Sequence, residues 1–212
     1  MALFLQYKAD GIQWAVWKME ESLEALYALL PEARRVSCEE AVSRFTSERR
    51  KLEWVSVRVL LYSMLSQDKE IAYSSENKPY LTDHSFFISI SHTKGYVAVI
   101  LGAHAPVGID IEQYSQRVHR VSDRYIRLDE QVEAYHGDTT WGLLLHWSAK
   151  EAVFKRMENA DADLRKLRLS HFIPQGEGGA TFQVREFATE SQKLYTVGYR
   201  IHPDFVLTWT QD

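Results

Sequence analysis

Two short segments of this chain place charged side chains among apolar ones, which costs free energy unless the charges are paired or bind something. The first covers residues 107–112, where apolar residues alternate with Gly108, Asp110 and Glu112. This period of two predicts a strand. Successive side chains of a strand point to opposite faces, so both carboxylates should lie on one face, close enough to share one cation.

The second segment covers residues 147–155 and reads WSAKEAVFK. Ser148 followed three residues later by Glu151 is the pattern of a capping box, which predicts that a helix begins here. Glu151 and Lys155 are four residues apart and should share one face of that helix. Two carboxylates from a strand and one from a helix start are oxygen ligands of the kind that Mg²⁺ prefers.

Together the two segments resemble the signatures of the 4′-phosphopantetheinyl transferases of the surfactin-synthetase-activating (Sfp) type. Those signatures are G-[IV]-D-[IVL]-E and, later in the chain, W-[ST]-x-K-E-[AS]-x-x-K, and both are complete here. The resemblance implies a Mg²⁺-dependent holo-[acyl-carrier-protein] synthase. Such an enzyme moves the 4′-phosphopantetheine group of coenzyme A to a serine of an acyl or peptidyl carrier protein and releases adenosine 3′,5′-bisphosphate. The carrier would belong to fatty acid, polyketide or nonribosomal peptide biosynthesis.

The resemblance also implies roles for individual residues. Asp110, Glu112 and Glu151 would bind Mg²⁺, and Lys155 would contact coenzyme A and offset charge that develops on the transferred phosphoryl group. Glu151, or a water oriented by it or by Glu130, would remove the proton of the carrier serine.

Further charged residues in the first half of the chain have two interpretations. Residues 38–66 carry apolar side chains at helical spacing, with Arg49 and Arg50 beside them. A charge run of this kind often forms the solvated face of a helix. The resemblance implies that an arginine here contacts the 3′-phosphate of coenzyme A. Arg49 is the better match to that position, and Arg50, the next residue, is the alternative. Arg58 is expected to be structural.

Two more segments of the first half resemble the family. Residues 77–81 match G-K-P-x-[LIF] except that Asn77 replaces glycine, and asparagine is the residue next best able to take a left-handed turn. Lys78 is therefore a candidate phosphate contact, or else an ordinary exposed lysine. Residues 86–93 predict a strand that retains Ser91 and His92 of the family pattern, whereas Ser89 stands where the family commonly has asparagine. A lone histidine at a strand end is more often a structural residue, but beside a predicted anion site Ser91 and His92 are candidates to hold the nucleotide phosphates.

A basic stripe follows the acidic strand. Its arginines recur at three, four and three residues, and an apolar stripe one residue on repeats the spacing, which predicts an amphipathic helix. The stripe is either a solvated face or a docking surface for an acidic carrier-protein helix. Its members are Arg117, Arg120, Arg124 and Arg127, beside Val118, Val121, Tyr125 and Leu128.

The remaining pattern predicts a mixed α/β protein. Strands are expected at residues 1–7, 11–16, 86–93, 95–103, 182–187, 194–201 and 205–209, and helices at 18–30 and 38–66. The resemblance implies a pseudo-dimer of two similar α/β halves with the active site in the cleft between them. Residues 1–104 would then carry the coenzyme A phosphate contacts, and residues 105–212 the metal-binding acids and the docking surface for the carrier.

Composition excludes several classes of protein. The net charge of −4 argues against general nucleic-acid binding, and no apolar run is long enough to span a membrane. The single cysteine, Cys38, fits a reducing compartment, so we expect a cytoplasmic protein. The resemblance implies a monomer.

Two other functions are compatible with the sequence. One is a relative that binds coenzyme A or a carrier protein without transfer, against which the intact acids argue. The other is a different Mg²⁺-dependent phosphotransferase. The glycine-rich residues 175–180 lack the Lys-Ser/Thr of a P-loop, which argues against that alternative.

Overall fold

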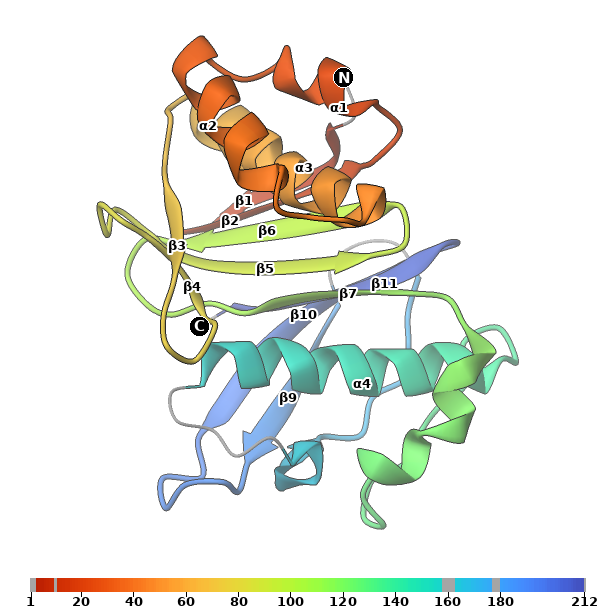
Figure 1. The fold of residues 1–212 in the computed structure, drawn as a ribbon. Coiled ribbons are helices and arrows are strands. Elements are labelled where there is room, and N and C mark those ends of the chain that lie inside the picture. Colours follow the sequence, from red (N-terminus) through yellow and green to blue (C-terminus); the bar gives the residue numbers. More distant parts are fainter. Residues whose placement is uncertain (1–2, 10, 158–162, 177–179, 212) are drawn as a thin grey trace. The chain divides into compact units, whose positions relative to one another are not determined.

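The computed structural model describes residues 3–9, 11–157, 163–176 and 180–211. The chain divides into two compact units, Met1–His104 and Ala105–Asp212. Each unit combines an antiparallel sheet with a helix of 18 residues, so the protein is of the mixed α+β class (Figure 1).

The sheet of the first unit has four antiparallel strands in the order β1-β2-β6-β5. Helix α3 packs against β2 and β6, and Val55 and Leu60 of the helix form one core with Val97 and Val99 of β6. Strands β3 and β4 form a separate small sheet. The elements are β1 (Leu3–Ala9), β2 (Ile12–Lys18), α1 (Leu23–Tyr27), α2 (Glu32–Val42), α3 (Glu48–Leu65), β3 (Ile71–Tyr73), β4 (Pro79–Leu81), β5 (Phe87–Thr93) and β6 (Tyr96–Gly102).

The sheet of the second unit has five antiparallel strands in the order β7-β11-β10-β9-β8. Helix α4 lies across it, with most of its contacts to β11 and β7. The elements are β7 (Ile109–Gln113), the 3₁₀ helices η1 (Gln116–Arg120) and η2 (Ser122–Arg124), α4 (Thr139–Arg156), η3 (Leu164–Lys166), β8 (Leu167–Leu169), β9 (Thr181–Glu186), β10 (Leu194–His202) and β11 (Phe205–Thr210).

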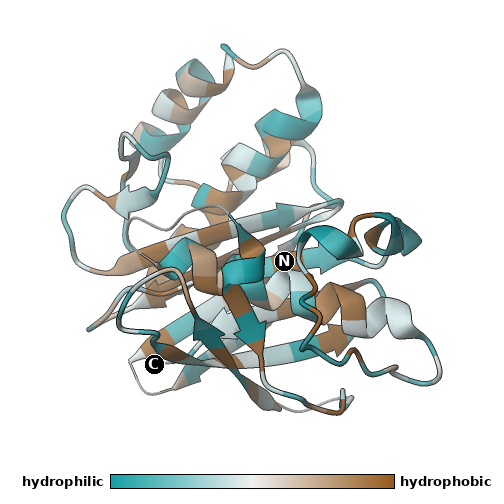
Figure 2. Ribbon diagram, turned by 90° about the horizontal axis from the view of Figure 1, so that it is seen from below, coloured by the Kyte–Doolittle hydropathy of each residue, from teal (hydrophilic) through white to brown (hydrophobic). Residues whose placement is uncertain are grey.

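Hydrophobic residues occupy long stretches of the strands and helices, as Figure 2 shows. In the second unit, Leu145, Ala149 and Val153 recur every four residues along α4 and form the core with Val197 and Val206 of the sheet. This stripe fixes which side of α4 faces the sheet, and hence where its charged residues point.

Each predicted strand is present near its expected bounds, although residues 1–2 of the first lie outside the described residues, and β3, β4 and β8 were not predicted. Two helix predictions are wrong in the first unit. Residues 18–30 do not form one helix, because β2 continues to Lys18 and α1 covers only Leu23–Tyr27. Residues 38–66 are also not continuous. Helix α2 ends at Val42, and the Ser47 side chain accepts a hydrogen bond from Arg50 N to begin α3.

The prediction that a helix begins at Ser148 is wrong as well. Helix α4 begins nine residues earlier at Thr139, where Asp138 accepts a hydrogen bond from Thr140 N. The Ser148 hydroxyl lies in the middle of the helix and bonds to the Thr208 hydroxyl of β11 at 2.9 Å. Glu151 is therefore an interior helix residue, free of the capping role that its spacing suggests.

The predicted basic helix is replaced by two short 3₁₀ helices, η1 and η2, and Arg127 follows them in a loop. No helix in the described residues is long and apolar enough to cross a membrane. Part of the glycine-rich segment, residues 177–179, lies outside the described residues.

Candidate active site

Strand β7 and helix α4 approach each other very closely at Gly108, the residue before the strand. A Cβ atom at this position would lie 1.8 Å from the carbonyl oxygen of Ala152. The Gly108 amide donates to the Thr210 hydroxyl at 2.9 Å, which fixes it against β11. The glycine of the first signature is therefore explained by packing, since only glycine lets the two backbones approach so closely.

Two side-chain contacts join β7 to α4 along the same line. Trp147 Nε1 donates to Glu112 Oε1 at 3.0 Å, and Lys155 Nζ donates to Asp110 Oδ1 at 2.7 Å. Lys155 Nζ also donates to the Ile109 carbonyl at 3.1 Å. The two sequence signatures thus form one structural unit, in which residues of the second hold the acids of the first.

The carboxyls of Asp110, Glu112 and Glu151 interact electrostatically as a cluster. Burial, and then repulsion by Asp110, raise the pKa of Glu112 to about 7, while the hydrogen bond from Trp147 lowers it. Burial, and then repulsion by Asp110, also raise the pKa of Glu151. Asp110 thus repels the carboxylates of both Glu112 and Glu151, and a bound cation would relieve that repulsion.

The donor set suits Mg²⁺ in kind, because all three side chains offer carboxylate oxygens. Among the described residues, however, no group of three His, Cys, Asp or Glu is arranged so that it could hold a metal ion. Asp110 instead bonds to the Lys155 ammonium, and Glu112 bonds to the Trp147 indole. Magnesium binding by Asp110, Glu112 and Glu151 therefore remains a prediction.

Glu130, the other candidate base, lies in a buried ion pair. Its Oε2 accepts a hydrogen bond from Lys150 Nζ at 2.6 Å, and the side chains of both residues are 0% exposed. The same oxygen accepts from Arg127 N at 2.9 Å, and Oε1 accepts from Leu169 N at 2.7 Å. Both carboxylate oxygens are thus engaged by the fold. The sequence analysis did not predict this pairing of Lys150 with Glu130.

The first unit holds a pocket of about 410 Å³ that brings together two of the predicted phosphate contacts, Arg49 and His92. Arg49 Nε donates to Glu53 Oε1 at 2.7 Å, and His92 Nδ1 lies 3.8 Å from the same oxygen. Glu53 therefore offsets positive charge at this pocket, a contact that the sequence analysis missed. The lining residues are Ser47, Arg49, Arg50, Glu53, Trp54, Val57, Arg58, Tyr73, Ile90 and His92.

Arg58 is buried in that lining. Its guanidinium stacks on the Trp54 ring at 3.1 Å from the centroid and donates to the Trp54 carbonyl at 3.0 Å. Burial is the main reason why the pKa of Arg58 falls to about 10. These local contacts are consistent with the structural role expected for this arginine.

The other two predicted phosphate contacts are not among the described residues that line this pocket. Lys78 follows Asn77, whose φ of 60° gives the left-handed turn expected when asparagine replaces glycine. The turn is closed by a hydrogen bond from Asn77 N to the Ser74 carbonyl at 3.0 Å. Ser91 is buried on β5. Their roles as phosphate contacts stay predictions.

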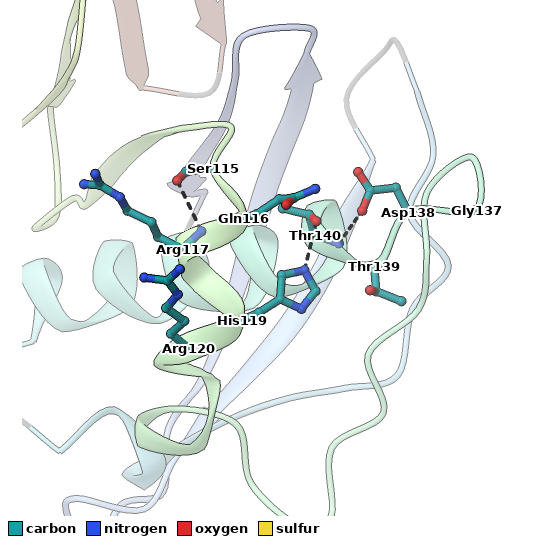
Figure 3. A pocket seen from close by; sticks show the side chains of 9 residues that line it. All are labelled: Ser115, Gln116, Arg117, His119, Arg120, Gly137, Asp138, Thr139 and Thr140. Atoms are coloured by element: carbon teal, nitrogen blue, oxygen red, sulfur yellow. Dashed lines mark hydrogen bonds between the residues drawn. The ribbon is translucent and has the colours of Figure 1, made fainter.

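The predicted basic surface is divided by the structure. Arg117 and Arg120 line a second pocket, of about 700 Å³, beside the start of α4. Figure 3 shows both arginines projecting away from His119, which bonds to the Thr140 hydroxyl at 2.9 Å. Arg127 is held differently, because its guanidinium pairs with Asp129 and donates to the Arg165 carbonyl at 2.7 Å. Arg127 therefore stabilises the loop in which it lies.

The raised pKa of Glu112 predicts a pH dependence for any cation-dependent reaction here. At limiting Mg²⁺ the rate should rise as the pH passes through about 7, because Glu112 must lose its proton to bind a cation. High Mg²⁺ should move the midpoint to lower pH. Trp147→Phe, which removes the hydrogen bond that lowers this pKa, should move it to higher pH.

The measurement is the transfer rate from about pH 5.5 to about pH 8.5, a range centred on the expected midpoint, at two Mg²⁺ concentrations. A pH–rate midpoint that changes neither with the Mg²⁺ concentration nor in Trp147→Phe would contradict the prediction.

The stability of the cation-free fold should change with pH in the opposite direction to the rate. Because the folded pKa of Glu112 lies above its ordinary value of 4.5, the cation-free fold should lose stability as the pH rises from that value to about 7.

Comparison with known proteins gives one match. Residues 106–210 match the family model of the 4′-phosphopantetheinyl transferase superfamily. The match covers most of the second unit and both signatures, and it supports the superfamily as the class to which this unit belongs. It also supports phosphopantetheine transfer in general as the activity, with coenzyme A as the substrate of the family.

The matched range does not include the predicted phosphate contacts of the first unit, which are Arg49, Lys78, Ser91 and His92. No curated protein matched the chain.

Proposed function

We propose that this protein is an Sfp-type enzyme that transfers 4′-phosphopantetheine from coenzyme A to a serine of an acyl or peptidyl carrier protein. The observation that carries the proposal is the contact between the two signatures. Trp147 holds Glu112 and Lys155 holds Asp110, so the acids of β7 face the helix that carries Glu151. The superfamily match over this unit supports the same reaction class.

In the proposed reaction the serine Oγ attacks the phosphorus that bears the pantetheine arm. One Ser–O–P bond forms, and the bond between that phosphorus and the bridging diphosphate oxygen breaks. Adenosine 3′,5′-bisphosphate leaves with the bridging oxygen. Asp110, Glu112 and Glu151 would hold Mg²⁺, which when bound would polarise the diphosphate and stabilise the leaving oxygen.

The remaining roles fall to the protein's own side chains. Lys155 is partly exposed, and its ammonium would offset charge on the transferred phosphoryl group. The serine proton would pass to Glu151, directly or through a water, because a carboxyl with a raised pKa is a better base near neutral pH. Glu130 suits this role less, since its carboxylate is buried against Lys150.

For the first unit, we propose that the pocket at α3 binds the nucleotide phosphates. Arg49 and His92 line this pocket together, and Arg50 lines it as well, so the choice between Arg49 and Arg50 is one for binding experiments. We propose two further contacts to the nucleotide phosphates: Lys78, in the turn before β4, and Ser91, on β5.

The test of the reaction is release of adenosine 3′,5′-bisphosphate from coenzyme A, followed by chromatography. Release should require Mg²⁺ and an apo carrier protein, and it should stop when the acceptor serine of the carrier is replaced with alanine. A non-catalytic relative would bind coenzyme A without release. Another phosphotransferase would act without the carrier serine, and either result would contradict the proposal.

We further propose that Arg117 and Arg120 guide an acidic helix of the carrier to the second unit. Both are exposed, and among the described residues neither forms an ion pair. Charge reversal at both positions, Arg117→Glu with Arg120→Glu, should raise the KM for the carrier about 10-fold and leave the KM for coenzyme A unchanged. Steady-state kinetics in each substrate measure this. Arg44→Glu, at an exposed arginine of the first unit, is the control. Equal effects on both substrates would refute the proposed surface.

A further inference from the structure

Leu128 is an exposed apolar side chain in a loop whose backbone is held in place by several contacts. Its relative exposure is 109%, the highest among the large hydrophobic residues that the structure describes. A lone exposed leucine is common on protein surfaces and needs no explanation by itself. What distinguishes Leu128 is how firmly the residues on both sides of it are fixed.

The loop that carries Leu128 is fastened to the protein interior from both sides. Before it, Lys150 Nζ donates to the Tyr125 carbonyl at 2.5 Å, and the Tyr125 side chain is buried against Trp147. After it, Glu130 accepts hydrogen bonds from Lys150 and from the backbone amide of Leu169. The buried pair of Lys150 and Glu130 thus closes the loop at both ends.

The residues next to Leu128 are fixed as well. The Arg127 guanidinium pairs with Asp129 across the leucine and donates to the Arg165 carbonyl. Arg127 also lies over the Phe187 ring, 5.1 Å from its centroid. The Leu128 backbone is therefore preorganised. A partner that packs against the Leu128 side chain would bind with little loss of conformational entropy in this loop.

The charge around this loop selects the kind of partner. Arg124 is exposed like Arg117 and Arg120, and no ion pair among the described residues neutralises any of the three. Of the acids in this stretch, Asp129 is already paired with Arg127 and lies 3.4 Å from Arg168, which leaves Asp123 as the exposed exception. Beside Leu128, both Arg127 and Arg168 approach the single carboxylate of Asp129, so the charge there is net positive. An apolar side chain beside net positive charge fits a partner that presents an apolar residue among acidic ones.

We propose that Leu128 is the apolar anchor of the carrier-protein interface, in the loop that follows η2. The inference rests on the proposed function and adds a residue to it. Lys150, which fastens the loop, is adjacent in sequence to Glu151 on α4. A carrier helix seated on Leu128 is thus positioned through the same helix that carries the candidate base. Leu128 acts by contact with the partner and takes no part in the chemistry.

The test compares Leu128→Ala with Ile173→Ala, a control at another exposed apolar residue of the same unit with 67% relative exposure. Leu128→Ala should raise the KM for the apo carrier about 10-fold, as truncation of an interface anchor does. Leu128→Asp should raise it further, because it adds a like charge opposite the acidic helix. The melting temperature, the KM for coenzyme A and the rate at saturating carrier should stay unchanged.

Two results would overturn the inference. Carrier KM values for Leu128→Ala and Ile173→Ala that both equal the wild-type value would show that the leucine makes no contact with the carrier. Absence of transfer by the wild-type protein to any of several carriers would refute the proposed function, and this inference with it. The wild-type rate, measured first, separates the two cases.

Discussion

Replacement of Asp110 with alanine should reduce phosphopantetheine transfer by about 1000-fold or more, which is the loss expected when a charged group at a phosphoryl-transfer centre is removed. After burial, repulsion by Asp110 is the next largest cause of the raised pKa of both Glu112 and Glu151, so Asp110 belongs to the centre of the carboxylate cluster. It also orients Lys155 through a 2.7 Å contact. The variant loses a proposed metal ligand and the partner of the proposed phosphoryl contact together.

The same variant should remain folded, because it removes repulsion from a cluster of acids. Without Asp110 the pKa of Glu112 should fall toward its ordinary value, and the cation-free protein should be at least as stable near neutral pH. Transfer rates and melting temperatures measure the two effects. Asp110→Asn separates charge from size, and Glu190→Ala, at an exposed acid of the same unit, is the control. An Asp110→Asn variant that retains more than about a tenth of the activity would contradict the role of this charge.

The second large effect is expected at Gly108. Gly108→Ala would place a methyl group 1.8 Å from the Ala152 carbonyl oxygen, and neither backbone can move without displacing β7 or α4. We expect a loss of unfolding free energy of about 3 kcal/mol or more, which is the range of severe overpacking. Any folded fraction should also lose transfer activity, because the acids of β7 would shift relative to Glu151.

Gly137→Ala is the matched control for that prediction. No atom lies within 4 Å of a Cβ at Gly137, but its φ of +79° favours glycine. Its expected cost is therefore the backbone strain alone, about 1 kcal/mol. Denaturant unfolding of both variants gives the comparison. Equal losses would show that contact with α4 does not determine the choice of glycine in the first signature.

The acidic strand could be predicted from the sequence because its pattern is local. Alternation of apolar residues with Asp110 and Glu112 sets a period of two, and β7 covers both. The left-handed turn at Asn77 was predictable for the same reason, since it depends on one residue's backbone preference. The match of the second unit to the superfamily was predictable because both signatures lie in the matched range of residues.

The start of α4 could not be predicted in this way. The spacing of Ser148 and Glu151 is the same in a capping box and in the middle of a helix, and only the packing of Ser148 on Thr208 distinguishes them. The helix begins at Thr139, among residues with weak helix preference, because Asp138 caps it and its apolar stripe packs on the sheet.

Contacts between distant residues were also beyond the sequence. Lys150 and Glu130 are 20 residues apart, and no local pattern predicts that they pair. The arginine spacing predicted one basic helical face, yet the residues from Arg117 to Arg124 form two 3₁₀ helices, and Arg127 turns to Asp129. The helical period was a weak guide here because the segment is short and its conformation depends on tertiary contacts.

The most direct test of the central claim is the intact mass of an apo acyl carrier protein after incubation with this protein, coenzyme A and Mg²⁺. The account predicts a gain of about 340 Da, the mass of the phosphopantetheinyl group, on the acceptor serine. The gain should disappear with EDTA and with Asp110→Ala. A gain of mass that persists under both conditions would contradict the role of the carboxylate cluster. No gain on any of several unrelated carriers, by a protein that fails to bind coenzyme A, would contradict the transferase itself.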